Sequence, residues 1–225
     1  MKKILALSLF INFSLLLLLG YSERHAIKEK IFPLKKEEYN AHYLERKSLF
    51  EELITTKGNI IFLGDSITEG GEWAELLGNP QIVNRGIGGD TAKGIINRLD
   101  SIVSASPKKV FIMIGVNDLS RGVSVKTLLK NYETIIQRLK DDTTAEIYVQ
   151  SVFPATNQSF KRTGQIPLVN QKLKRLSDQM KVIFVDLYPL FSVDGTMNKS
   201  YSFDGVHLNG EGYRLWAKEV KEYVK

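Results

Sequence analysis

Residues 59 to 70 read NIIFLGDSITEG, a stretch that joins a short apolar run to an abrupt polar turn. The residues from Ile60 to Leu63 are apolar at consecutive positions, which is typical of a β-strand buried on both faces. Gly64 and Asp65 interrupt the run, and Ser66 follows where a helix is expected to begin. The stretch therefore predicts a buried strand with a hydroxyl group just beyond its carboxyl end.

Four similar runs and five helical patterns alternate along the rest of the chain. The runs are QIVNRGI (81 to 87), KVFIMIGVND (109 to 118), EIYVQSVFP (146 to 154) and KVIFVDLYP (181 to 189). The helical patterns lie near residues 72 to 78, 91 to 105, 124 to 140, 166 to 180 and 210 to 224. This alternation predicts an α/β fold with a parallel sheet covered by helices on both faces. Functional groups are then expected at the carboxyl ends of the strands.

The N-terminus has the pattern of an export signal. Lys2 and Lys3 precede an almost unbroken apolar run from residue 4 to residue 19. The run is long for a cleaved signal and short for a membrane span, so residues 1 to 22 are interpreted as a signal peptide or a membrane anchor. We expect an exported protein: secreted, periplasmic or anchored to the outer face of the cytoplasmic membrane, with residues 4 to 19 as the membrane-associating segment if the anchor is retained.

The remaining 203 residues divide into two parts in the sequence. Residues 23 to 57 are charged and contain Pro33, and they predict a linker that leads into an amphipathic helix. Residues 58 to 225 hold all the strand patterns and predict one domain. The chain has no cysteine, which excludes disulfides, thiolate metal sites and a cysteine nucleophile. Its net charge of +6 is scattered rather than clustered, so no nucleic-acid partner is expected.

A candidate catalytic pair lies near the C-terminus, in the sequence FDGVHLNGEGY. Only three histidines are present, and His207 alone follows the last strand pattern. Asp204 stands three residues before it, where its carboxylate can accept the Nδ1 proton and leave Nε2 as a general base. Ser66 would be the nucleophile, although the G-x-S-x-G elbow of many serine hydrolases is broken here by Thr68. The alternative is that Ser66 is only a helix cap.

A hydrolysis of this kind also needs hydrogen-bond donors for a developing oxyanion. The sequence offers three: the backbone N–H of Ser66 at a helix start, the N–H of Gly86 in NRGIGGDT, and the side-chain amide of Asn117 in GVND. Each also has a simpler interpretation, as a helix cap, a turn residue or a loop-capping amide respectively. All three fall at the same predicted edge of the sheet as Ser66 and His207.

These motifs together resemble a family. GDSIT at 64 to 68, the glycine within NRGIGGDT, GVND at 115 to 118 and DGVH at 204 to 207 are similar to the four ordered blocks of the SGNH, or GDSL-type, esterases and acyl hydrolases. The resemblance is strongest to the catalytic subunits of platelet-activating factor acetylhydrolase and to bacterial acetylesterases. It implies a flavodoxin-like three-layer α/β/α sandwich with a five-stranded parallel sheet, and no metal or organic cofactor.

The resemblance also implies the role of each site residue. Ser66 would be the nucleophile, His207 the base and Asp204 its orienting acid, while Ser66, Gly86 and Asn117 would form the oxyanion hole. With export, it favours short-chain esters, above all acetyl esters, on an envelope or extracellular glycan. A lysophospholipid or other lipid ester is the alternative substrate.

Three other hypotheses remain at this point. GIGGD at 86 to 90 could cradle a phosphate, although Thr91 replaces the last glycine of a dinucleotide fingerprint. Asp65, Asp118, Asp204 and His207 could form a metal-dependent phosphoesterase site. Finally, the chain could be an exported binding module on the same scaffold.

Overall fold

The computed structural model describes residues 39–53, 58–157, 159–160 and 163–225. The predicted signal peptide or anchor at 1 to 22 and most of the predicted linker lie outside these residues. Asn40–Lys225 form one compact unit, and it begins well before residue 58 because the helix α2 (Ala41–Glu52) belongs to it. In the part of the chain that is described, no helix is long and apolar enough to cross a membrane.

The centre of the unit is a five-stranded sheet in which every pair of neighbours is parallel. Its strands are β1 (Ile60–Gly64), β2 (Ile82–Gly86), β3 (Lys109–Met113), β4 (Glu146–Gln150) and β5 (Ile183–Val185). Their order is β2-β1-β3-β4-β5, which is the order of flavodoxin-like folds. The predicted fold class is therefore confirmed, and the register aligns the carboxyl ends of β1, β2 and β3 at one edge.

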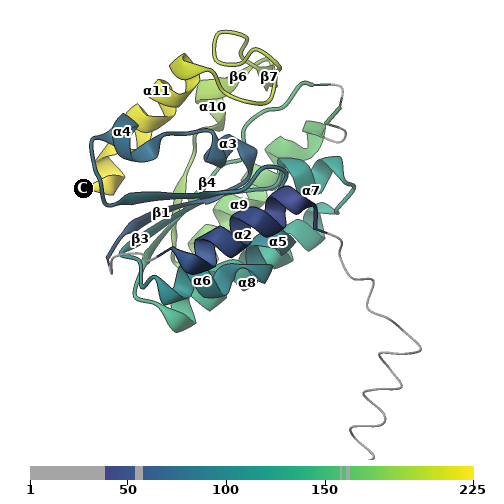
Figure 1. Ribbon diagram of the computed structural model, residues 1–225. Coiled ribbons are helices and arrows are strands. Elements are labelled where there is room, and N and C mark those ends of the chain that lie inside the picture. The colour runs from purple at the N-terminus through teal and green to yellow at the C-terminus, as the bar shows by residue number, and fades with distance from the viewer. Residues whose placement is uncertain (1–38, 54–57, 158, 161–162) are drawn as a thin grey trace, which may run out of the picture. The chain divides into compact units, whose positions relative to one another are not determined.

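Helices cover both faces of this sheet (Figure 1). On one face α4 (Trp73–Leu77) packs against α11 (Gly210–Val220). On the other face, neighbouring helices contact one another in the series α5 (Ala92–Asn97), α8 (Val125–Asp142) and α9 (Ile166–Met180), with α6 (Leu99–Ser104) beside α8. Shorter elements complete the unit: α3 (Ser66–Glu69), α7 (Val116–Ser120), α10 (Tyr188–Phe191), the hairpin β6 (Ser192–Val193) and β7 (Thr196–Met197), and the 3₁₀ turns Thr163–Gln165 and Lys221–Val224.

The single helix predicted for residues 91 to 105 is wrong in one respect, because the structure has two helices there. The break falls at Arg98, whose backbone leaves helical geometry at φ −119° and ψ 14°. Its side chain is buried and pairs with Asp90, with Nε to Oδ2 at 2.8 Å. This buried ion pair lies at the break between the two helices. Helical periodicity in the sequence does not predict the break.

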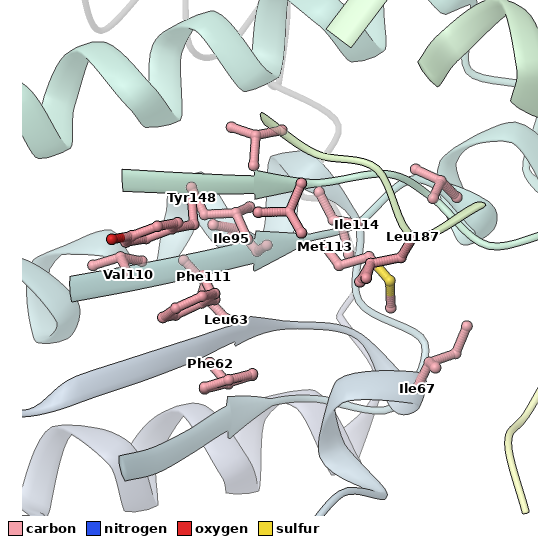
Figure 2. Packing of buried hydrophobic residues seen from close by; sticks show 14 of the residues in the cluster. Phe62, Leu63, Ile67, Ile95, Val110, Phe111, Met113, Ile114, Tyr148 and Leu187 are labelled. Carbon is pink, nitrogen blue, oxygen red and sulfur yellow. The ribbon is translucent and has the colours of Figure 1, made fainter. Parts of the chain in front are cut away.

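The core is built from aromatic rings stacked across adjacent strands. Phe62, Phe111 and Tyr148 stand in register on β1, β3 and β4, with ring centroids 4.7 and 4.4 Å apart. Figure 2 shows these three side chains along the sheet. Trp73 extends the stack at 4.4 Å from Phe62 and is fully buried, so it belongs to the core and not to a pocket. The stack places the start of α4 firmly against the sheet.

Candidate active site

The nucleophile candidate lies where β1 ends and α3 begins. Asp65 is the N-cap of α3, and its carboxylate accepts a hydrogen bond of 3.0 Å from the N–H of Ile67. Ser66 is the first helical residue, so the alternative that Ser66 is the cap is wrong. The Ser66 side chain is thus left available for chemistry, and no described residue accepts a hydrogen bond from its backbone N–H.

Ser66, His207 and Asp204 form one continuous chain of hydrogen bonds. Ser66 Oγ lies 2.9 Å from His207 Nε2, although the two residues are 141 positions apart in sequence. His207 Nδ1 lies 2.7 Å from Asp204 Oδ2. This is the arrangement in which a carboxylate orients an imidazole and the imidazole takes the proton of a hydroxyl.

The loop that carries the pair is itself held by the carboxylate of Asp204. The Oδ1 atom accepts hydrogen bonds from the backbone N–H groups of Val206 and His207, at 2.9 and 2.8 Å. Partial burial alone would raise the pKa of Asp204, but the hydrogen bonds from the His207 side chain and from the two N–H groups outweigh it and lower the pKa to about 2. Asp204 is therefore ionised at neutral pH and stabilises positive charge on His207.

Asn117 lies on α7 at the end of β3 with a side chain that is almost fully buried. Its Nδ2 atom donates to the backbone oxygen of Asp90 at 3.0 Å. A carboxamide carries two N–H groups, so this bond fixes the amide and leaves the second N–H for another acceptor. The geometry is that of a preorganised donor.

Gly86 does not have the geometry predicted for it. Its N–H already donates to Asn84 Oδ1 at 2.8 Å. A Cβ added at Gly86 would lie 2.2 Å from the backbone nitrogen of Glu69 and 2.8 Å from the oxygen of Asp65. The residue is glycine because β2 passes very close to the backbone around α3, which is a packing requirement. As a correction, Gly86 is a structural residue here and not a free donor.

Gly89 is the residue that the sequence analysis missed. It lies three residues further along the same motif, at φ +74°, a conformation that favours glycine. Arg121 Nη2 binds its carbonyl at 2.6 Å, and Asn117 binds the next carbonyl, that of Asp90. Within the described ranges its N–H has no acceptor. The double glycine before Asp90 was the available signal, because a turn with positive φ can present an N–H toward an anion.

Three buried carboxylates surround the site and have structural roles. Asp65 caps α3, Asp90 pairs with Arg98, and Asp118 accepts the N–H of Ala92 at the start of α5 at 3.0 Å. Burial raises the pKa of Asp65 to about 7 and that of Asp118 to about 6, and burial also raises the pKa of Asp90. These carboxyl groups are committed to backbone N–H groups or to Arg98.

The same contacts bear on two of the earlier alternatives. Among the described residues no group of three or more histidine, cysteine or carboxylate side chains is arranged to hold a metal ion. Asp118 occupies the N-terminus of α5, where a phosphate cradled by residues 86 to 90 would have to bind. A second anion there would be repelled, so the geometry favours neither alternative.

The comparisons with known proteins show the family to which the chain belongs. Residues 62–215 match the GDSL-like Lipase/Acylhydrolase family. The chain belongs to this family. It is therefore an ester hydrolase, as the sequence analysis predicted.

Individual relatives give a finer picture of this GDSL-like acylhydrolase. A solved structure from Streptococcus pneumonia, described provisionally as a platelet activating factor, has 30% identity and a TM-score of 0.75, covering 82% of this chain and 93% of that one. The platelet-activating factor acetylhydrolase IB subunit alpha2 of Rattus norvegicus is 27% identical over 175 residues, which are 74% of this chain and 76% of the relative. An N-acylneuraminate cytidylyltransferase of Streptococcus agalactiae is 24% identical over 197 residues. That match covers 84% of this chain but only 45% of the relative, so this chain spans about half of it.

Proposed function

We propose that this acylhydrolase cleaves short-chain esters by a two-step reaction through an acyl-enzyme on Ser66. The observation that carries the proposal is the unbroken hydrogen-bond chain from Ser66 Oγ through His207 to Asp204, at 2.9 and 2.7 Å. In the first step His207 Nε2 takes the hydroxyl proton while Ser66 Oγ attacks the acyl carbonyl carbon. His207 then returns this proton to the leaving alcohol oxygen, and the ester C–O bond breaks.

In the second step water replaces the alcohol. His207 removes a proton from the water as its oxygen attacks the acyl-enzyme carbon, and the same proton returns to Ser66 Oγ as the acid leaves. Asp204 keeps the imidazole in the correct tautomer throughout and stabilises its positive charge. In both steps the oxyanion would accept from the Ser66 N–H, the second N–H of Asn117 and, in place of Gly86, the N–H of Gly89.

We propose an acetyl ester on an envelope or extracellular glycan as the substrate. The acetylhydrolase among the relatives supports the acetyl group. The N-terminal apolar run supports export, and with it access to such glycans. A lysophospholipid or other lipid ester is the second candidate, because the acetylhydrolase relative is named for a lipid mediator.

Two measurements test these proposals. Labelling by a serine-reactive fluorophosphonate should be strong in the wild-type protein and absent in Ser66→Ala. Failure to label the wild-type protein would refute Ser66 as the nucleophile. A series of esters with acyl chains of two to twelve carbons, run beside acetylated glycans, separates the substrate classes. Preference for the long chains would refute the acetyl esterase and favour the lipid alternative.

A further inference from the structure

A cavity of about 560 Å³ lies directly beside the triad, and the mechanism above does not use it. Asp204 itself forms part of its wall. The other lining side chains are the hydroxyls of Thr156, Thr196 and Ser202, the ammonium group of Lys199, and the apolar groups of Met197 and Phe203. The cavity is therefore bounded mainly by the loop before His207 and by the hairpin of β6 and β7, and it mixes hydroxyl and charged groups with apolar surface.

Phe203 is the unusual member of this wall, because 93% of its surface is exposed. Its backbone is nevertheless held on both sides. Ser202 is buried and forms a β-bridge with Leu208, while the Asp204 carboxylate is bound to His207. The fold gains almost nothing from burying this ring, yet the backbone that carries it is held in place within the catalytic loop.

The reaction geometry determines which part of a substrate reaches this cavity. The acyl oxygen must face the donors at Ser66 and Asn117, whereas the alcohol oxygen must face His207 Nε2, which protonates it. The alcohol part of the ester therefore lies on the His207 side of the nucleophile, and the cavity adjoins the same loop, since Asp204 and Gly205 line it.

The hydroxyls of Thr156 and Thr196 donate to backbone carbonyls at 3.4 and 2.7 Å, so their oxygens face a ligand as acceptors. An aromatic face beside such acceptors suits a sugar ring, whose C–H face packs on the aromatic ring while its hydroxyls donate hydrogen bonds.

We propose that this cavity is a binding subsite for a sugar unit adjacent to the ester-bearing unit of a glycan, with Phe203 as its stacking platform. The inference rests on the proposed glycan esterase function and adds a specific consequence. Oligosaccharide esters should bind better than the acetylated single sugar, because only the former reach Phe203. Small aryl esters should not depend on Phe203 at all.

The test compares Phe203→Ala with Phe203→Tyr, which keeps the ring. Val193→Ala is the matched control, since Val193 is an exposed apolar residue of the hairpin that bounds the cavity but does not itself line it. The substrates are p-nitrophenyl acetate and acetylated oligosaccharides of xylose or N-acetylglucosamine, each of one and four units. We expect Phe203→Ala to raise KM for the tetramer about tenfold, the scale of one aromatic stacking contact. KM for the acetylated monomer, and all constants for p-nitrophenyl acetate, should stay at the wild-type values.

The outcomes separate the subsite from the function on which it rests. If the wild-type protein cleaves p-nitrophenyl acetate but none of the acetylated sugars, the glycan function fails and the subsite fails with it. If it cleaves the sugars, but without preference for tetramers or with Phe203→Ala at wild-type KM, only the subsite is refuted. An equal loss on every substrate would also refute the subsite, because Phe203 would then act through the triad. Wild-type behaviour of Phe203→Tyr and Val193→Ala, beside the tetramer-specific loss in Phe203→Ala, supports it.

Discussion

Replacing Asn117 by alanine tests the oxyanion hole most directly, because the structure allows its catalytic and structural effects to be estimated separately. The variant removes one preorganised donor from the transition state, a change that costs about 3 to 4 kcal/mol, or roughly 100- to 1000-fold in kcat. It also removes the hydrogen bond to the Asp90 oxygen, a loss of about 1 kcal/mol in stability. A large kinetic effect should therefore accompany a small thermal one.

Asn170 provides a control that is matched in residue type and burial. Both asparagines are 7% exposed, but Asn170 lies on α9 and binds the backbone N–H and carbonyl of Val152 at 2.8 and 2.9 Å. Asn170→Ala loses two hydrogen bonds and should cost about 2 kcal/mol of unfolding free energy. Its kcat should remain near that of the wild-type protein.

The assay is kcat and KM on p-nitrophenyl acetate, together with urea unfolding of the same preparations. We expect Asn117→Ala to lose kcat with little change in KM and Asn170→Ala to lose only stability. A kcat for Asn117→Ala within about threefold of wild type would refute the role of this amide. A kcat loss of similar size in both variants would show that the effect comes from general destabilisation of the fold.

Three further predictions concern the charged groups around the site. Asp204→Asn should lower kcat by about 10⁴-fold in steady-state assays, because an amide favours the wrong imidazole tautomer of His207. A kcat near that of the wild-type protein would contradict the role of Asp204 in orienting His207. Burial raises the pKa of Asp65 from 3.8 to about 7, so this carboxyl ionises at lower pH in the unfolded chain, and the free energy of unfolding should fall as pH rises from 3.8 to about 7. Asp65→Asn keeps an acceptor for the Ile67 N–H and should flatten this fall when urea unfolding is measured across the pH range. An unchanged pH dependence in the variant would contradict the prediction. Arg98→Leu leaves Asp90 as an unpaired buried charge and should cost about 3 to 5 kcal/mol in thermal unfolding, whereas a Tm near wild type would show that the pair adds little.

The sheet could be predicted from the sequence because strands buried on both faces leave a strong signal. Within the run from 109 to 118, residues 110 to 114 are all apolar, and in the structure all five residues of β3 are buried. The same run continues past the strand, however, and the chain turns into α7 at Val116. Apolar composition reports burial, but it does not distinguish the last residues of a strand from a buried turn.

The hydrogen-bond chain from Ser66 through His207 to Asp204 could also be predicted, since its partners are side chains whose chemistry is visible in the sequence. The oxyanion hole that we propose was predicted only in part, because two of its donors are backbone N–H groups. Every residue except proline has an N–H, and its direction depends on the local φ and ψ angles. Gly86 and Gly89 look alike in the sequence, but one N–H binds Asn84 and the other has no acceptor among the described residues. Only the structure separates a glycine required by packing from one that can present a donor.

Helix α2 shows that the sequence can predict a helix without predicting its contacts. Its pattern predicts an amphipathic helix but not the surface on which it docks, and in the structure Tyr43 and Phe50 are buried against the domain. Its His42 and Arg46 bind Glu69, the last residue of the helix that Ser66 begins, at 3.1 and 3.2 Å.

Gly88, beside the Gly89 donor, lies against this cluster, since an added Cβ would be 3.1 Å from Glu69 Oε2 and 3.3 Å from the His42 ring. Helix α2 thus supports both the helix that Ser66 begins and the turn that carries Gly88 and Gly89, although it precedes the family match that begins at residue 62. Because these contacts come from a helix that precedes the first strand, the unit that holds this site in place begins at Asn40.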